Sequence, residues 1–353
     1  MDGMNGFNEY NGYMPADNRG GPDQLKAARK HFSMLGGMFV LGTLVFYAVQ
    51  LIPTIIVGVL KPEWLMNPDV TLLVSSVPMY LVGMPLMIVL VRIVPADRLE
   101  RRSMKAGDFV LSAIMCFAVM YASNFVGNII TAIIGILKGS AVDNVINDIA
   151  SATSMWLVFL VMVICAPIME EYIFRKLIVD RTVRYGEGIA ILISGLMFGL
   201  FHGNLNQFAY AFSLGVFLAF LYVKTGNLKI TIALHMMINF VGGVVSKWLM
   251  EQVDIDEYMR IISDGMDMDR LMSYVMDHLG GWVAYIAFLV FVMGMMIGGG
   301  VLLIINLVKK KFVLNRGAVT IPRGKRFRTF FLNVGMIIYC LFWIVMIIVQ
   351  LLM

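Results

Sequence analysis

Charged side chains are scarce in this sequence of 353 residues. Only 14% are Asp, Glu, Lys or Arg, whereas 59% are hydrophobic and the mean hydropathy is +0.82. A soluble domain carries about 25% charged residues, so the composition excludes an ordinary soluble fold. The apolar residues form blocks near the ~20 residues that a helix needs to cross a bilayer, and strand-period alternation is absent. We therefore expect an all-α polytopic membrane protein, a bundle of about eight to nine transmembrane helices.

Cysteine is also rare. Cys116, Cys165 and Cys340 all fall within apolar blocks and lack the paired spacing that binds zinc or builds a disulfide framework, so we interpret them as packing residues. A fixed-period repeat and a phosphate-binding or dinucleotide-binding loop are absent as well. Residues 1–32 lack the apolar segment of a cleavable signal and predict a flexible cytoplasmic tail.

The apolar blocks predict nine spans, of which the fifth is short enough to be a half-helix or part of a longer helix beginning near residue 186. The spans are 34–60, 71–94, 109–137, 154–175, 189–203, 208–224, 228–250, 281–308 and 329–353. They divide the chain after the tail into N-terminal transmembrane helices (33–150), a core (151–250), an acidic extracytoplasmic loop (251–280) and C-terminal transmembrane helices (281–353).

The basic residues predict the orientation of the chain, because short cytoplasmic loops carry the excess of Lys and Arg. They cluster in the tail and in 95–105, 175–184 and 309–328, whereas 251–280 is acidic. Nine spans then place the N-terminus inside and the C-terminus outside. The net charge of +5 is explained by this topology, so no nucleic-acid partner is expected. The charged segment 176–187 is expected to protrude into the cytoplasm, and 266–279 to form an amphipathic segment on the outer surface.

Ionised side chains within membrane helices cost about 2.5–3.5 kcal/mol on insertion scales, so those that persist usually have a function. The stretch IMEEYIFR, residues 168–175, contains three. Glu171 and Arg175 are four residues apart and can pair on one helical face, whereas Glu170 points about 100° away and has no basic neighbour at helical spacing. Pro167 removes a backbone donor just before them and is expected to bend the helix.

Two further apolar blocks carry polar pairs with a spacing of four residues. MFGLFHGN places Phe198 one turn before His202, and ALHMMINF places His235 one turn before Asn239. If the chain reverses at Gly186, Glu170 and His202 each lie sixteen residues from the reversal and are level with each other, roughly 24 Å above it.

His235 lies nine residues after a second reversal at Gly226 and meets Glu170 and His202 only if that reversal lies about 10 Å higher than the first. Together these groups have the chemistry to activate a water. The carboxylate can take a proton or hold a metal, the imidazoles can bind metal or stabilise an oxyanion, and the amide can donate to developing charge. Taken singly, a membrane histidine more often joins two helices, and Phe198 is more often an ordinary core residue.

The three motifs, in this order, resemble the signature of the CAAX prenyl endopeptidase and bacteriocin-processing intramembrane proteases, also called the CPBP or Abi family. Its pattern of Glu-Glu-x-x-x-Arg, Phe-x-x-x-His and His-x-x-x-Asn is complete here in Glu170, Glu171, Arg175, Phe198, His202, His235 and Asn239. The resemblance covers roughly residues 150–245, which makes the segment 151–250 the expected catalytic core.

The resemblance implies an intramembrane endopeptidase, with a metalloprotease as one form, whose cavity opens to the cytoplasm of a bacterial membrane. Glu170 would activate the water, His202 and His235 would bind metal or the oxyanion, and Asn239 would assist at the oxyanion. Glu171, Arg175 and Phe198 would support the site. The resemblance leaves open whether a metal takes part in the reaction. Such a metal would be one divalent ion such as zinc, held by His202, His235 and Glu170.

The implied partners are a peptide or membrane-protein substrate and the lipid bilayer. Two other classes of function are alternatives to an endopeptidase. A non-catalytic immunity or scaffold protein of the same fold has no reason to retain an unpaired Glu170. A transporter also uses buried ionisable groups, but it usually shows related halves, and the motifs have no second copy.

Overall fold

A computed structural model describes residues 21–142 and 144–352, and it contains eight helices that are long and apolar enough to cross a membrane. A ninth, α9, spans Glu187–Phe201 and has 15 residues. At 1.5 Å per residue such a helix is only about 22 Å long, shorter than the ~30 Å apolar layer. The predicted bundle is therefore confirmed, and α9 explains why the predicted number of spans lay between eight and nine.

The N-terminal part of the chain that the structure describes forms five α-helices. They are α1 (Pro22–Leu60), α2 (Pro68–Pro78), α3 (Met84–Arg92), α4 (Ala106–Lys138) and α5 (Val145–Ala152). A π-helical turn joins α2 to α3, so that Pro68–Arg92 is one continuous span. The first span begins at Pro22 rather than at residue 34, because proline suits the first helical turn and Ala28, His31 and Phe32 are buried against the bundle. Residues 1–20 of the predicted tail lie outside the described residues.

The core helices carry the three motifs. They are α6 (Met155–Leu157), α7 (Ala166–Glu171), α8 (Asp180–Thr182), α9, α10 (Leu205–Thr225) and α11 (Leu228–Asn239). The first three are parts of one helix, Met155–Tyr185, in which π-helical turns occupy 158–165 and 172–179. The predicted reversals are present, because Gly186 and Gly226 both have positive φ (118° and 56°), a conformation that favours glycine.

The C-terminal part contains two further spans and two short helices in the segment predicted to be an acidic loop. The elements are α12 (Ser246–Val253), α13 (Ile255–Ser263), α14 (Met268–Asp277), α15 (Leu279–Val308), α16 (Arg326–Phe330) and α17 (Val334–Leu352). A π-helical turn over 240–245 connects α11 to α12. The segment 251–280 is thus mainly helical, and α14 forms where an amphipathic segment was expected.

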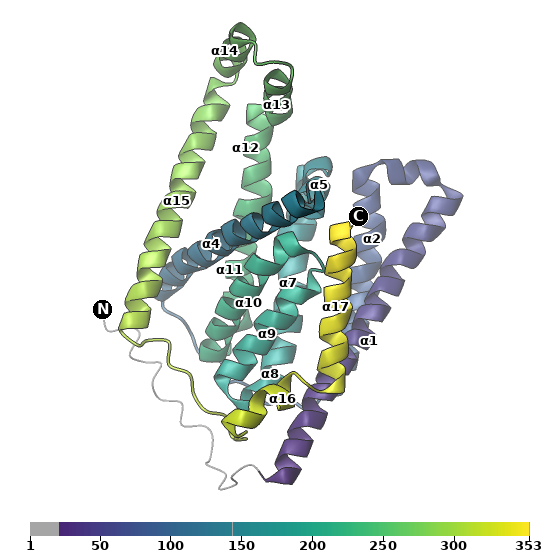
Figure 1. Cartoon of the computed structure of the whole chain (residues 1–353), viewed down its shortest axis with the longest axis vertical. Helices are drawn as coiled ribbons and strands as arrows, with labels where there is room; N and C mark the ends of the chain where they lie inside the picture. The colour runs from purple at the N-terminus through teal and green to yellow at the C-terminus, as the bar shows by residue number, and fades with distance from the viewer. Residues whose placement is uncertain (1–20, 143, 353) are drawn as a thin grey trace.

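The helices pack in three groups (Figure 1). α1, α2, α3 and α17 lie together on one side, the core helices are in the middle, and α12 and α15 extend beyond the rest to carry α13 and α14. α4 crosses the molecule obliquely and contacts both α10 and α15. One buried cluster joins α1, α3, α9 and α17, and a second joins α4, α10 and α11. Phe198, a residue of the second motif, belongs to the first cluster.

The charged segment 176–187, which the sequence predicts to protrude into the cytoplasm, is packed against other parts of the protein. Asp180, Arg181 and Glu187 are 3–6% exposed. Asp180 accepts from Lys176 and Tyr222, and Glu187 accepts from Lys224 and from the backbone N–H of Asn315. The sequence did not predict these partners, which come from α10 and the segment after α15. Buried charges are tolerated when they are paired and hydrogen-bonded.

Candidate active site

Glu171 and Arg175 form a fully buried ion pair. Glu171 Oε1 lies 2.9 Å from Arg175 Nη2, and both side chains have no exposed surface. Oε1 is also 2.9 Å from His235 Nδ1, so this carboxylate joins the first motif to the third. Because it is held between a guanidinium and an imidazole, Glu171 is ionised and acts as an acceptor. It organises the site and is not available to react.

Glu170 lies in different surroundings although it is the next residue. Its side chain is 18% exposed, and its Oε2 lies 3.7 Å from Nε2 of His235. The guanidinium of Arg175 pairs with Glu171, and among the described residues no Lys or Arg forms an ion pair with Glu170. The structure therefore leaves one neutralised carboxylate and one accessible carboxylate, as the helical spacing predicted.

Phe198 is the packing centre of the site and is 1% exposed. The guanidinium carbon of Arg175 lies 4.6 Å from the centre of its ring, a cation–π contact. The edges of His202 and His235 meet the ring at centroid distances of 4.8 and 5.8 Å. Phe198 thus touches a residue of each motif, which explains why an apolar residue accompanies His202 at a spacing of one turn.

The hydrogen bonds of the two imidazoles fix which nitrogen carries the proton. Nδ1 of His235 faces the ionised Glu171 and must donate, and Nδ1 of His202 lies 2.9 Å from the carbonyl oxygen of Phe198 and must also donate. In the neutral rings both Nε2 atoms therefore present lone pairs. Both rings contact Phe198, so His202 lies beside His235, whose Nε2 faces Glu170.

Asn239 has a structural contact that the motif alone does not reveal. Its Nδ2 donates to the carbonyl oxygen of Met162, 2.8 Å away. In the π-helical turn the N–H of Ala166 donates to Val161, and the next donor in that register would be residue 167, which is proline. Met162 thus loses its backbone donor to Pro167, and Asn239 replaces it. The second N–H of the Asn239 amide remains to serve the site.

Two tyrosines near Glu170 were not found by sequence reasoning. Tyr80, in the π-helical turn between α2 and α3, and Tyr210, on α10, both interact electrostatically with the Glu170 carboxylate. Tyr80 belongs to no spaced motif, so only the packing of distant helices shows it. For Tyr210 a local signal exists, because Asn204, Gln207 and Tyr210 repeat every three residues at the start of α10.

The donor atoms of Glu170, His202 and His235 suit a divalent ion, since both Nε2 atoms carry lone pairs and each Nδ1–H is held by an acceptor. Their spacing is less suitable. Within residues 21–142 and 144–352, no three His, Cys, Asp or Glu side chains are arranged to share a metal ion. Metal binding therefore remains a proposal.

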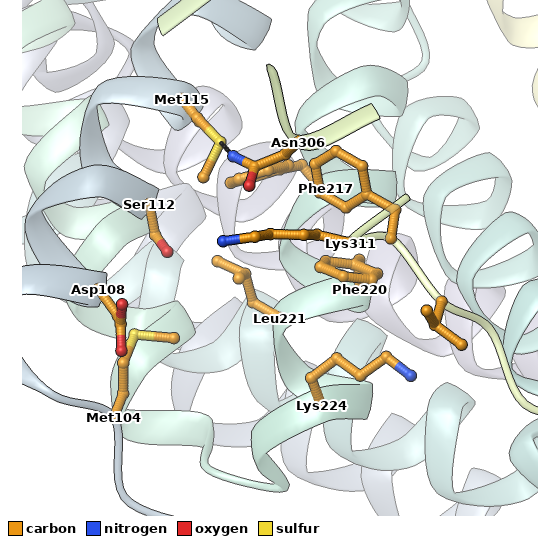
Figure 2. A pocket seen from close by; sticks show the side chains of 12 residues that line it. Met104, Asp108, Ser112, Met115, Phe217, Phe220, Leu221, Lys224, Asn306 and Lys311 are labelled. Atoms are coloured by element: carbon orange, nitrogen blue, oxygen red, sulfur yellow. Dashed lines mark hydrogen bonds between the residues drawn. The ribbon is translucent and has the colours of Figure 1, made fainter. Parts of the chain in front are cut away.

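A separate cavity lies between α4, α10 and the end of α15, and it contains none of the motif residues (Figure 2). Its volume is about 40 Å³, which is enough for about one or two water molecules. The Lys311 side chain runs between Phe217 and Phe220, and its ammonium group points toward Ser112. This cavity is distinct from the candidate active site.

The fold and these side chains define an integral membrane protein with a buried carboxylate and imidazole site. Comparison with known proteins shows what the core segment is similar to. Residues 152–241, which contain all three motifs, match the model of the type II CAAX prenyl endopeptidase Rce1-like family. The resemblance inferred from the motifs is thus confirmed, and this segment is an Rce1-like domain.

Two curated bacterial relatives are similar to the chain. The "Putative membrane peptidase YdiL" of Bacillus subtilis is 29% identical over 170 residues, which cover 46% of this chain and 68% of the relative. The "Membrane-embedded CAAX protease MroQ" of Staphylococcus aureus is 34% identical over 83 residues, which cover 22% of this chain and 34% of the relative. No solved structure matches the chain.

Proposed function

We propose that this protein is an intramembrane endopeptidase of the CAAX-protease type that hydrolyses a peptide bond with a water activated by Glu170. One observation carries the proposal. The carboxylate of Glu170 is accessible and faces Nε2 of His235 at 3.7 Å, whereas the adjacent Glu171 is neutralised by Arg175. Because Nδ1 of His235 carries the proton, Nε2 of His235 and the carboxylate of Glu170 are both hydrogen-bond acceptors. A water molecule between them can donate a hydrogen bond to each.

The residues present are sufficient for a balanced reaction. Glu170 takes a proton from the water as the water oxygen bonds to the substrate carbonyl carbon, whose oxygen becomes negative. The carboxyl group of Glu170 then gives this proton to the departing nitrogen as the C–N bond breaks. Asn239 donates its second N–H to the oxyanion, and His202 and His235 orient the water. Glu171, Arg175 and Phe198 hold the two rings in place.

A divalent ion such as zinc, if bound, would be held by Glu170, His202 and His235, and it would lower the pKa of its bound water. Because the three side chains are not arranged around one ion here, the steps above do not depend on it. Metal analysis of the purified protein, with activity measured before and after chelation, tests this alternative. Loss of activity that zinc restores would support a metallopeptidase.

We further propose that the site opens toward the cytoplasm of a bacterial membrane and acts on peptides or membrane proteins. The names of the two relatives support a membrane peptidase, and both relatives come from bacteria. The basic segments 95–105 and 309–328 support an inward orientation of the end that carries them.

The test is cleavage of internally quenched peptides, with and without a C-terminal prenyl group, by the protein purified in detergent micelles. Glu170→Ala and Glu170→Gln should abolish cleavage while leaving expression and thermal stability intact. Glu63→Ala is the matched control, because Glu63 is 59% exposed and lies far along the chain from the motifs. Cleavage by both Glu170 variants, or none by the wild type, would contradict the proposal. The second result would favour an immunity or scaffold protein.

A further inference from the structure

The candidate site contains more hydrogen-bond acceptors than donors. The Glu170 carboxylate and the Nε2 lone pairs of His202 and His235 are all acceptors, and one N–H of Asn239 is used by Met162. A peptide hydrolase must stabilise a negative oxygen in its transition state, which requires donors that are already in position. A further donor is therefore expected within reach of Glu170.

A chain of hydrogen bonds at the start of α10 shows which group this is. The backbone N–H of Gln207 donates to Oδ1 of Asn204 at 2.8 Å. A backbone N–H can only donate, so this bond fixes the Asn204 amide, whose Nδ2 then donates to the carbonyl of His202 (3.1 Å) and to Oε1 of Gln207 (2.5 Å). The orientation of both amides follows without ambiguity.

The orientation of the Gln207 amide also determines the role of the Tyr210 hydroxyl. With Oε1 of Gln207 accepting from Asn204, its Nε2 is the donor in the 2.8 Å contact with the Tyr210 hydroxyl. The Tyr210 oxygen thus accepts from Gln207, and its own hydrogen must point elsewhere. Gln207, the middle member of the chain, is buried at 8% exposure. Tyr210 packs against both buried clusters, and the chain of hydrogen bonds that ends on it begins at the backbone carbonyl of the site residue His202.

We propose that Tyr210 is a further catalytic residue of this site, whose hydroxyl hydrogen donates to the substrate oxygen that becomes negative. This inference rests on the proposed peptidase function. No proton is transferred, and the phenol stays neutral throughout. Asn204 and Gln207 are positioning residues, because they occupy the Tyr210 lone pair and so direct its hydrogen toward the reacting groups.

The experiment compares two variants that remove the same hydrogen bond. Tyr210→Phe deletes both the bond to Gln207 and the donated hydrogen, whereas Gln207→Met deletes the bond and leaves the hydrogen. If Tyr210 is a donor, Tyr210→Phe lowers kcat about 100-fold with KM nearly unchanged. Gln207→Met then lowers kcat only a few-fold. Equal losses in the two variants would show that the bond is merely structural and would overturn the inference.

Tyr121→Phe is the matched control, since the Tyr121 hydroxyl on α4 is buried and makes no hydrogen bond within the described part of the chain. It should keep wild-type kcat, and the thermal stability of all three variants should be measured alongside. Full activity of Tyr210→Phe in a protein whose Glu170→Ala variant is inactive would refute the role of Tyr210 alone. A wild-type protein that cleaves no peptide would instead refute the proposed function.

Discussion

Two adjacent carboxylates of this protein differ because of their contacts and not because of their chemistry. Glu171 is fully buried between Arg175 and His235, whereas Glu170 is 18% exposed and pairs with no Lys or Arg among the described residues. The spacing of four residues identified the pair from the sequence. The contact of Glu171 with His235 was not predicted, because it joins residues 64 positions apart and depends on how α7 and α11 pack.

Replacing Glu171 by Gln should destabilise the protein, because it leaves the buried Arg175 charge without its partner. Removing one member of a buried ion pair costs about 3–5 kcal/mol. We expect a clear drop in the melting temperature in detergent and a lower yield of folded protein. Glu170→Gln is the natural control, since it should lose activity and keep stability. Equal melting temperatures for the two variants would contradict the view that Glu171 stabilises the fold and Glu170 does not.

At the scale of the helices, the sequence predicted that the spans exist and where they lie, but not their internal register. Bilayer thickness and the charged loops determine the spans, so most predicted ends agree with the structure within a few residues. The π-helical turns at 158–165, 172–179 and 240–245 have no signal in composition. Their register follows from contacts between helices, such as that of Asn239 with Met162.

The contact between Asn239 and Met162 gives a test of the π-helical register at Pro167. Asn239→Ala should destabilise the protein by about 1 kcal/mol, because it leaves the half-buried Met162 carbonyl without a donor. Pro167→Ala restores a backbone N–H at the position where the register needs one. In that background Asn239→Ala should have a smaller effect on the melting temperature. If the effects of the two substitutions simply add, residue 167 does not supply the donor that Asn239 replaces.

The close packing of α9 and α10 places Phe198, and Gly215 makes this possible. A Cβ at residue 215 would lie 2.9 Å from the Phe198 ring and 3.1 Å from the Gly195 backbone. Gly215→Ala should therefore displace Phe198 and cost about 1–3 kcal/mol, and it should lower activity through His202 and His235. Gly294→Ala on α15 is the control, because a Cβ there meets nothing within 4 Å. Similar stability and activity of the two variants would contradict this account.

At the scale of the whole molecule, the structure gathers the basic segments at one end (Figure 1). The backbone N–H of Asp97 donates to Asp180, that of Arg102 donates to Thr225, and that of Val319 donates to Arg184. These bonds tie 93–105, 175–185, 225 and 309–325 together, at the end where α1 begins and α8 and α16 lie. The helices α5, α13 and α14 lie at the opposite end. The sequence predicted from charge alone that 95–105, 175–184 and 309–328 lie at the same end, since each carries an excess of Lys and Arg.

The proposed orientation can be tested with single cysteines in a variant whose Cys116, Cys165 and Cys340 are replaced by Ala. Lys61→Cys and Asp256→Cys should react with a membrane-impermeant maleimide on intact cells, because these exposed residues lie at the end opposite the basic segments. Arg316→Cys should react only after the membrane is permeabilised, since it lies in the basic segment held against Glu187 through Asn315. The reverse labelling pattern would show that the bundle has the opposite orientation in the membrane. The site would then face away from the cytoplasm, and substrates with cytoplasmic C-terminal ends would be excluded.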